Sequence, residues 1–307
     1  MSGQVIPAGG TALARFARAV ARAPWSWMRW AGVALGFLAG SVLRIRRAHV
    51  EAAMRRAGLT DVPALARAMY ASLGTAVFEF LWFAGRGTPR ASALVLGERA
   101  RAVLAEHGRE ARRGTGTRGL VVATAHTGNW DFVACALSRD HLDLSVVTKR
   151  LSAPWLDRFW QERRASFGVE LLHGAGVFGR AVEGVQRGRA VALLIDQVPE
   201  RRSAVTEFSF LGQRARCDTT AALLAARTGA PLVLALGRRL PDGRHWVDVP
   251  LILDPPPRAS HRWVEDATRA LNLELERFVL EHPSQWLWMH RRWKGSSIKV
   301  RKFDPRA

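Results

Sequence analysis

The chain has 307 residues, of which 48% are apolar, so it is long enough to bury one sizeable core and is not an intrinsically disordered protein. Its 46 Lys and Arg against 26 Asp and Glu give a formal net charge of +20. Such an excess indicates an anionic partner: nucleic acid, an anionic membrane surface, or an acidic protein or substrate. The two cysteines, Cys135 and Cys217, form no motif with the nine histidines, so we expect both to be reduced packing residues in a cytosol-facing domain.

The N-terminal segment combines an uncharged run, Trp30 to Leu43, with arginines on both sides. Its 14 residues are short for a membrane-spanning helix, which needs about 20. The basic residues after the run disfavour a cleaved signal peptide, and the neighbouring Trp25 and Trp27 are typical of a membrane interface. We therefore expect residues 1–47 to anchor the protein on an anionic membrane surface, lying in the interface or spanning once. A buried soluble helix is the alternative.

Residues 48–111 have a helical pattern. An apolar stripe recurs every four residues, at Leu65, Met69, Leu73, Val77 and Leu81. A Gly-, Thr- and Arg-rich break at 112–119 then separates this helical segment from an α/β domain, which we place at 112–307.

In the α/β domain, strand and helix patterns alternate. Strands are predicted at 120–125, 144–148, 169–172, 190–195, 232–237 and 245–253. Helices are predicted at 129–138, from Pro154, at 177–187, after a capping Asp218, and from Ser260 to Pro283. Continuous apolar strands that alternate with helices predict an α/β fold with a mostly parallel central sheet flanked by helices. The tryptophans near the C-terminus, at 286, 288 and 293, fit core packing and a membrane interface equally well.

The segment AHTGNWD (125–131) follows the first of these strands and carries the most promising chemistry. In open α/β sheets, reacting groups gather where strands end and loops lead into helices. Gly128 permits a tight turn, and Asn129 can cap the next helix. The H-x4-D spacing allows Asp131 to reach back to the imidazole of His126, fix its tautomer and favour the imidazolium, so that His126 acts as a general base. The alternative is that Asp131 only interacts with the helix N-terminus.

Several segments, in the same order along the chain, resemble the bacterial lysophospholipid acyltransferase superfamily, and within it the lipid A lauroyl/myristoyl acyltransferases and the phosphatidylinositol mannoside acyltransferases. The resemblance rests on AHTGNWD (125–131), VVTKRLSAPWLDRFWQERRASFGVELL (146–172), GRAVALLIDQ (188–197), FSFLGQRARCDTTAALLAARTGAPLV (208–233) and PSQWLWMHRRWK (283–294). It covers residues 25–294, and the C-terminal string is the most specific part.

This resemblance implies a glycerolipid acyltransferase-like fold and transfer of a fatty acyl chain from acyl-ACP or acyl-CoA to a lipid or glycolipid hydroxyl. The acceptor would be a lipid A precursor, a lysophospholipid or a glycolipid, at the cytoplasmic face of the bacterial inner membrane. His126 would take the proton from the acceptor hydroxyl, and Asp131 would orient the ring. No cofactor, metal or covalent enzyme intermediate is implied, and the sequence has neither a G-x-S-x-G nor an HExxH motif.

The resemblance also implies basic groups that contact the substrate. Arg164 matches the family's arginine before Phe-Gly, and Lys149 and Arg150 are candidates for phosphate contact. A solvated loop is the alternative for the latter two. Glu207 matches an acidic residue of the mannoside acyltransferases that the lipid A enzymes commonly lack.

Other residues near the expected site are assigned supporting positions. Asp196 and Gln197 end a strand at the functional edge of the sheet, and we expect them, like Asn129, to support the site without touching the substrate. His290 and Arg291 fit structural packing as well as substrate binding.

Two other classes of function compete with this interpretation. Gly174, Gly176 and Gly179 form a G-x-G-x-x-G between a predicted strand and a helix, and Asp196 follows twenty residues after Gly176, as in a nicotinamide-dinucleotide-binding oxidoreductase. His173 and the short helix disfavour that class. The basic residues are dispersed and form no DNA- or RNA-binding motif, so we expect no specific nucleic acid partner.

Overall fold

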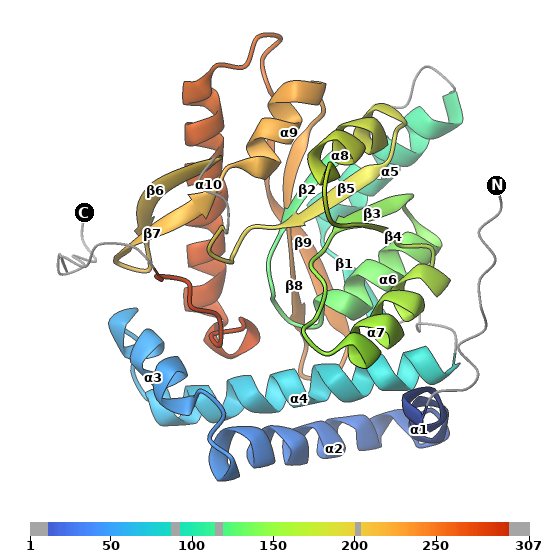
Figure 1. The fold of residues 1–307 in the computed structure, drawn as a ribbon, viewed down its shortest axis with the longest axis vertical. Coiled ribbons are helices and arrows are strands. Elements are labelled where there is room, and N and C mark those ends of the chain that lie inside the picture. The colour runs from blue at the N-terminus through green and yellow to red at the C-terminus, as the bar shows by residue number, and fades with distance from the viewer. Residues whose placement is uncertain (1–11, 87–92, 114–118, 200–203, 295–307) are drawn as a thin grey trace.

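The computed structural model describes residues 12–86, 93–113, 119–199 and 204–294. It combines an N-terminal layer of helices with an α/β unit that stands on this layer (Figure 1). Outside the described residues lie 114–118 of the predicted break, the first eleven residues of the predicted membrane anchor, and residues 295–307 at the end of the predicted α/β domain.

The N-terminal layer is a helical hairpin with two short helices attached. Its elements are α1 (Ala12–Val20), α2 (Trp25–Phe37), a π-helical turn (Leu38–Val42), α3 (Arg47–Arg56) and α4 (Val62–Arg86). The helices α2 and α4 pack antiparallel with their backbones in direct contact. A Cβ atom added at Gly36 would lie 2.3 Å from the carbonyl oxygen of Tyr70, and one at Gly32 would lie 2.2 Å from the Cα of Thr75. Small residues are therefore required along this helix contact.

The α/β unit contains a seven-stranded sheet in the order β1-β9-β8-β2-β5-β3-β4. Its strands are β1 (Leu94–Leu96), β2 (Leu120–Thr124), β3 (Leu144–Val147), β4 (Glu170–Leu172), β5 (Ala190–Leu194), β8 (Leu232–Arg239) and β9 (His245–Leu253). All neighbouring strands pair in parallel except β8 and β9, which are antiparallel. The prediction of a mostly parallel sheet is confirmed.

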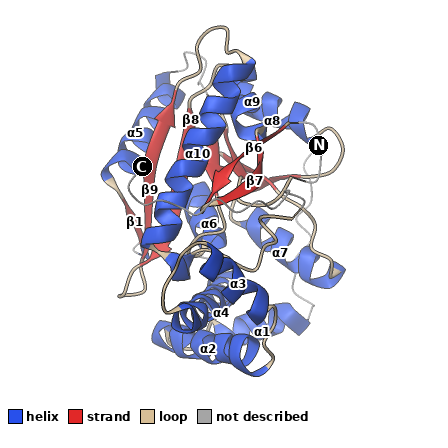
Figure 2. Ribbon diagram, turned by 90° about the vertical axis from the view of Figure 1, so that its left-hand side faces the viewer, coloured by secondary structure: helices blue, strands red, loops and turns tan. Residues whose placement is uncertain are grey.

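Helices cover both faces of this sheet (Figure 2). They are α5 (Glu98–Arg113), α6 (Trp130–Asp140), α7 (Pro154–Ser166), α8 (Val177–Gln186), α9 (Thr220–Thr228) and α10 (His261–Glu281). Along β2, Val121 and Ala123 pack into a core with α8, α9 and α10, whereas Leu120 and Val122 pack on the opposite face, in the core that also holds Ala100 of α5. Apolar residues on both faces are what the unbroken run of β2 predicts.

Two features differ from the predicted elements. The segment expected to be wholly helical, 48–111, contains β1, which pairs with β9 at the edge of the sheet. The stretch before α9 forms an antiparallel hairpin, β6 (Val205–Phe210) and β7 (Gln213–Asp218), that was not anticipated as strands.

Predictions on cysteines and tryptophans have mixed outcomes. Cys135 and Cys217 are both buried and unpaired, as expected for packing residues. Trp286 and Trp288 are buried in the core, whereas Trp27 and Trp30 are 63% and 75% exposed. Within the described residues, no helix taken singly has the length and apolarity to cross a membrane; the pair Trp25–Val42 and Arg47–Arg56 would do so together, but it is bent by 89°.

Candidate active site

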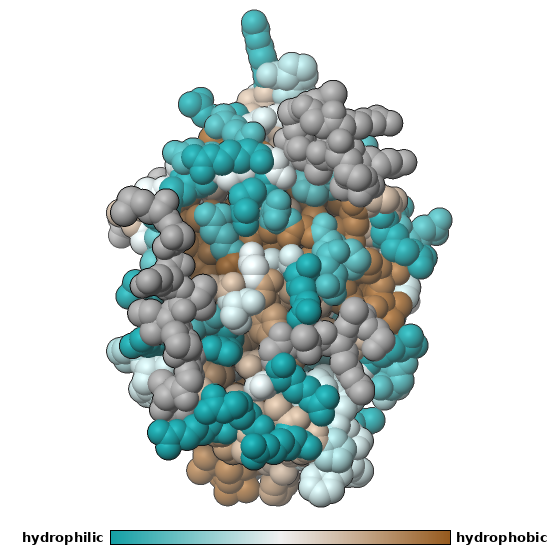
Figure 3. Space-filling model, turned by 90° about the vertical axis from the view of Figure 1, so that its right-hand side faces the viewer, coloured by the Kyte–Doolittle hydropathy of each residue, from teal (hydrophilic) through white to brown (hydrophobic). Residues whose placement is uncertain are grey.

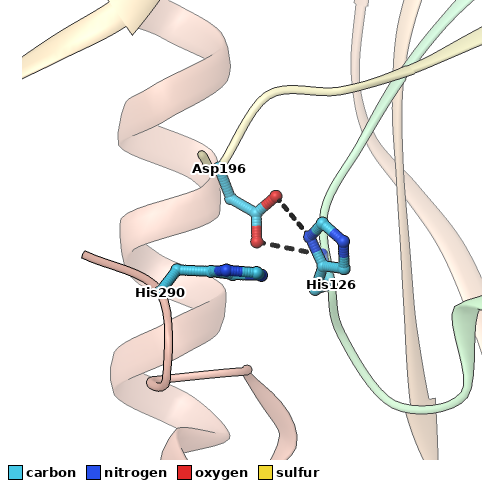
Figure 4. Close-up of side chains that lie close together, drawn as sticks. All are labelled: His126, Asp196 and His290. Atoms are coloured by element: carbon cyan, nitrogen blue, oxygen red, sulfur yellow. Dashed lines mark hydrogen bonds and ion pairs between the residues drawn. The ribbon is translucent and has the colours of Figure 1, made fainter. Parts of the chain in front are cut away.

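His126 and Asp196 meet because their strands are neighbours in register. Thr124 at the end of β2 pairs with Leu194 at the end of β5, and each residue of interest follows two positions later. The Nδ1 atom of His126 lies 2.9 Å from Oδ1 of Asp196, and the backbone N–H of His126 donates to Oδ2 at 3.0 Å (Figure 4). The carboxylate therefore holds both the ring and the backbone of the histidine.

Asp196 is fully buried and is surrounded by donors. The indole Nε1 of Trp286 donates a further hydrogen bond to Oδ2 at 3.0 Å. Burial alone would raise the pKa of Asp196, but the charge of His126 and the hydrogen bond from its ring outweigh burial and hold this pKa well below its usual value. Asp196 is therefore ionised at neutral pH and accepts the Nδ1 proton of His126, which leaves the lone pair of Nε2 available as a base.

The Nε2 side of His126 faces two partly buried side chains. The amide nitrogen of Gln197 lies 3.4 Å from Nε2 of His126 and 3.3 Å from Nε2 of His290, and the two imidazole rings are 4.6 Å apart. Burial and the charge of His126 lower the pKa of His290 to about 4, so His290 is neutral at pH 7. The side chain of His126 is 14% exposed and is therefore not fully sealed inside the protein.

The C-terminal segment after α10 fixes the turn that carries His126. The N–H of Leu287 donates to the carbonyl of His126 at 3.1 Å, and the N–H of Gly128 donates to the carbonyl of Gln285 at 2.8 Å. Gly128 has a φ of +56°, and a Cβ atom there would lie 2.9 Å from the carbonyl oxygen of Gly237. The turn thus needs glycine for both its conformation and its packing.

Asp131 does not pair with His126, so the predicted dyad is wrong in its second member. Asp131 lies in the first turn of α6 and accepts hydrogen bonds from Trp160 Nε1 at 2.8 Å and Arg164 Nε at 2.7 Å, both on α7. The reason is the helix start: Asn129 caps α6 through the N–H of Phe132, so Asp131 is already helical and its side chain is directed to α7. The carboxylate reaches α7 instead of the preceding turn.

The other predicted substrate contacts lie in different surroundings. Arg164 is committed to Asp131, with a closest approach of 2.6 Å, and it also reaches Thr148 Oγ1 at 3.4 Å. Lys149 and Arg150 are exposed in the loop after β3, and the charge of Lys149 is among those that lower the pKa of His290. Their contacts with substrate remain predictions.

Glu207 lies on β6, where its carboxylate pairs with Arg214 of β7 at 2.5 Å. Its side chain is about one third exposed, at 32%. This ion pair across the hairpin gives Glu207 a structural partner, and its substrate role remains a prediction.

The sequence predicted only a supporting position for Asp196 and Gln197, and it left packing and substrate binding open for His290. In the structure all three contact or face the ring of His126. Trp286 was considered only for core packing or a membrane interface, and its hydrogen bond to Asp196 was not anticipated. One signal could have placed Asp196: it lies two residues after the end of its strand, as His126 does, and the two strand ends are paired. Using this signal requires the order of the strands in the sheet to be known.

His126, Asp196 and His290 also offer three ligand atoms within 4.8 Å of one another. Two imidazoles and a carboxylate are a donor set that transition metals accept. However, hydrogen bonds from His126 and Trp286 already engage both oxygens of Asp196, so the arrangement as it stands is satisfied by protons. The arrangement therefore suits a histidine that acts as a base and is oriented by a carboxylate.

The dinucleotide interpretation does not fit the geometry of the glycine turn. In that fingerprint the third glycine permits close packing of helix on strand, but a Cβ atom at Gly179 would have nothing within 4 Å. The preceding strand, β4, is at the edge of the sheet, and Asp196 is bonded to His126 and is not free to bind a ribose. These observations disfavour a nicotinamide site here.

Comparisons with known proteins identify related acyltransferases. A phosphatidylinositol mannoside acyltransferase of Mycobacterium tuberculosis (strain CDC 1551 / Oshkosh) is 28% identical over 199 residues, which cover 62% of this chain and 59% of the relative. The lipid A biosynthesis lauroyltransferase of Escherichia coli (strain K12) is 31% identical over 115 residues, 37% of this chain and 36% of the relative. The chain thus matches less than two thirds of the length of these relatives.

A solved structure, the 1-acyl-sn-glycerophosphate acyltransferase PlsC from Thermotoga maritima, superposes with a TM-score of 0.37 at 12% identity, over 86% of this chain and all of that chain. The model of one protein family, bacterial lipid A biosynthesis acyltransferase, matches residues 10–295, which is nearly the whole sequence. With the predicted sequence segments and the observed α/β fold, this match shows that the chain belongs to the bacterial lipid A biosynthesis acyltransferase family.

Proposed function

We propose that this protein is a membrane-associated O-acyltransferase that transfers a fatty acyl chain from acyl-ACP or acyl-CoA to a hydroxyl of a lipid or glycolipid acceptor. The observation that carries the proposal is the pairing of His126 with the buried Asp196 in a chain of this family. The names of the relatives favour a glycolipid acceptor, such as a lipid A precursor or a phosphatidylinositol mannoside. A lysophospholipid acceptor is the alternative within the same chemistry.

In the proposed reaction, His126 is the general base. Its Nε2 takes the proton of the acceptor hydroxyl while the oxygen attacks the thioester carbonyl, and Asp196 stabilises the imidazolium that forms. When the tetrahedral intermediate collapses, the C–S bond breaks and the imidazolium returns the proton to the departing thiolate. The acyl group is then an ester of the acceptor, and His126 is again neutral.

Gln197 and His290 have positions that matter for this cycle. The amide of Gln197 rests against Nε2 of His126, so the acceptor hydroxyl has to take its place. Because His290 is neutral, only one of these two adjacent imidazoles, that of His126, becomes positively charged during the reaction. An Asp196 that stays ionised is suited to stabilise that charge.

A membrane location is supported by the outer face of the N-terminal layer. Large apolar side chains are exposed along α2 and the turn after it, at Trp27, Trp30, Phe37, Val42 and Leu43. Figure 3 shows hydrophobic residues at the lower end of the molecule, where α1 and α2 lie. An apolar pocket of about 500 Å³ opens between α1, α2 and α4 beside Trp27 and Trp30. Exposed apolar area of this kind on a basic protein is typical of a membrane-binding face.

The test is to incubate the purified protein with labelled acyl-CoA or acyl-ACP and a panel of acceptors, and to measure the product mass. The acceptors are a lipid A precursor, a phosphatidylinositol mannoside and lysophospholipids. We expect one of them to gain an acyl ester, and His126→Ala to abolish that transfer while the protein stays folded. The matched control is His261→Ala, because the His261 side chain is 86% exposed on α10. Undiminished transfer by His126→Ala would overturn the proposal.

A further inference from the structure

A buried carboxylate of the N-terminal layer lies directly under the catalytic turn. Glu79 on α4 is 2% exposed, and its two oxygens accept hydrogen bonds from Arg239 Nε at 2.8 Å and Arg239 Nη2 at 2.7 Å. The Nδ2 atom of Asn129 donates to Oε2 of Glu79 at 2.8 Å, and His245 Nε2 lies 3.4 Å from the same oxygen. Side chains from three other elements of the fold, β8, β9 and the start of α6, thus converge on Glu79.

Glu79 is ionised in this position. Burial alone would raise its pKa, but the charge of Arg239 and the nearby imidazole of His245 outweigh burial and lower the pKa to about 2. Arg239 is fully engaged as well, because it also donates to the carbonyl and Oγ of Ser72 on α4. Stability alone gives little reason for such a pair, since apolar residues of similar volume at buried ion-pair sites often stabilise a protein equally or more.

The network fixes the turn of His126 from one side through Asn129. The side chain of Asn129 has one rotamer that satisfies two tasks: Nδ2 donates to Glu79, and Oδ1 accepts from the N–H of Phe132 and so caps α6. Asn129 lies three residues after His126, with the positive-φ Gly128 between them. The same Nδ2 also donates to the carbonyl of Ala76 at 3.3 Å, so without Glu79 the amide of Asn129 would lose its shorter hydrogen bond to α4 and keep only the longer one.

The same network holds the turn from the other side through the C-terminal segment. The backbone N–H of Arg239 donates to Oε1 of Gln285 at 3.2 Å, and the carbonyl of Gln285 accepts from the N–H of Gly128. Glu79 therefore reaches both flanks of the turn, by Asn129 directly and by Arg239 and Gln285 in sequence. Its α4 neighbours Phe78 and Phe80 only contribute to packing, at the apolar pocket and on Trp160.

We propose that Glu79 is a positioning residue for the reaction: from the membrane-facing helical layer, it orients Asn129 and thereby the backbone turn that places His126 against Asp196. The test of this proposal by kcat rests on the proposed function, because it measures acyl transfer. The N-terminal layer is then part of the catalytic machinery as well as an anchor.

The test separates orientation from stability with two double variants. Glu79→Leu with Arg239→Met replaces the ion pair by apolar residues, which keeps the buried site filled but removes the carboxylate acceptor of Asn129 and leaves only the longer bond to the Ala76 carbonyl. Glu79→Gln with Arg239→Met is isosteric at position 79 and returns a carbonyl acceptor for Asn129. We expect kcat to fall about tenfold or more in the first variant, with KM for donor and acceptor unchanged, and to be largely restored in the second.

The matched control is Val185→Ala, which opens a cavity in α8, beside Gly119 at the opposite end of β2 from His126. It should lower Tm without lowering kcat at 25 °C. If the first double variant keeps the kcat of the wild type, or if the acceptor in the second variant restores nothing, Glu79 has no positioning role.

A second readout does not depend on transfer activity. Imidazole ¹⁵N NMR of His126 should show a protonated Nδ1 and an unprotonated Nε2 in the wild type and in Glu79→Gln/Arg239→Met. In Glu79→Leu/Arg239→Met the two tautomers should mix, because the ring loses its fixed approach to Asp196. If the wild type transfers no acyl group, the proposed function fails, whereas an unchanged tautomer in Glu79→Leu/Arg239→Met would overturn the role of Glu79.

Discussion

At the scale of single residues, the site depends on which atom of the His126 ring carries the proton. Asp196 accepts from Nδ1, while its second oxygen accepts from the backbone of His126 and from Trp286. The carboxylate has no freedom to rotate away from these three donors. The base at Nε2 is therefore set by a group that follows a different strand, β5, seventy residues further along the chain.

The two aspartates should respond differently to the same substitution. In Asp196→Asn, the amide oxygen must take the Oδ2 position to accept from Trp286 and the backbone, so the NH₂ group faces Nδ1. This forces the proton of His126 onto Nε2 and removes the base, so kcat should fall by roughly 10³-fold or more. Asp131→Asn instead weakens a largely buried ion pair with Arg164 and should cost about 2–4 kcal/mol of stability with less than a tenfold loss of kcat.

Kinetics and Tm, measured on both variants, decide between the two carboxylates. The Asp131 variant is the control, because it carries the same chemical change five residues from His126. Equal losses of kcat in two folded variants would return the orienting role to Asp131.

His290 should make stability depend on pH. Its pKa in the folded state is lowered to about 4, whereas the unfolded chain has a histidine pKa of about 6.5, so between these values the unfolded state binds more protons. The stability linked to His290 is therefore present above pH 6.5 and is lost as pH falls towards 4, by up to about 3 kcal/mol. Urea unfolding from pH 7.5 to 4.5 measures this loss, and His290→Gln should flatten the curve. Parallel curves for the variant and the wild type would exclude a buried, neutral His290.

At the scale of elements, the sequence predicted what is local and missed what depends on pairing. The strands of the sheet's centre and the helices after them were recovered. The choice of His126 as a candidate also needed only a local pattern, an apolar run followed by His-x-Gly-Asn. The contact of His126 with Asp196 needs the β2–β5 register, which no local pattern contains. The hairpin of β6 and β7 was missed because its two-residue turn, Leu211-Gly212, lacks the usual Asn-Gly signal although both φ angles are positive.

Two helical glycines form a matched pair for testing the contact between α2 and α4. Gly36→Ala adds a Cβ atom 2.3 Å from the Tyr70 carbonyl and should destabilise the protein by about 1–3 kcal/mol through overpacking. Gly179→Ala on α8 meets nothing within 4 Å and should stabilise it by about 0.5–1 kcal/mol, because alanine lowers the entropy of the unfolded chain. The free energy of unfolding measures both effects. An equal change at the two sites would contradict backbone-to-backbone packing of the hairpin.

At the scale of the whole molecule, the exposed apolar face of α2 and the turn of His126 are separated by only two helices, α2 and α4. The exposed aromatic side chains of α2 lie on one side of the hairpin, α4 packs against the other side of α2, and Glu79 of α4 reaches the turn of His126. Figure 1 shows this layer extending beneath the sheet. If the exposed face of α2 lies on a membrane, as proposed, the turn of His126 is separated from that membrane by this helical layer.

The exposed tryptophans of α2 should therefore provide much of the affinity for a membrane. Inserting about half of each ring, roughly 100 Å² of apolar area, contributes about 2.5 kcal/mol per tryptophan, so Trp27→Ser with Trp30→Ser should lower binding to anionic liposomes by at least about a hundredfold. Leu273→Ser with Leu280→Ser is the control, since these residues are 49% and 39% exposed on α10. Liposome flotation at physiological salt measures binding, with duplex DNA as the competing polyanion. If the control loses as much binding as the tryptophan variant, or if DNA displaces the protein from liposomes, the net charge and not the aromatic face of α2 determines where this protein binds.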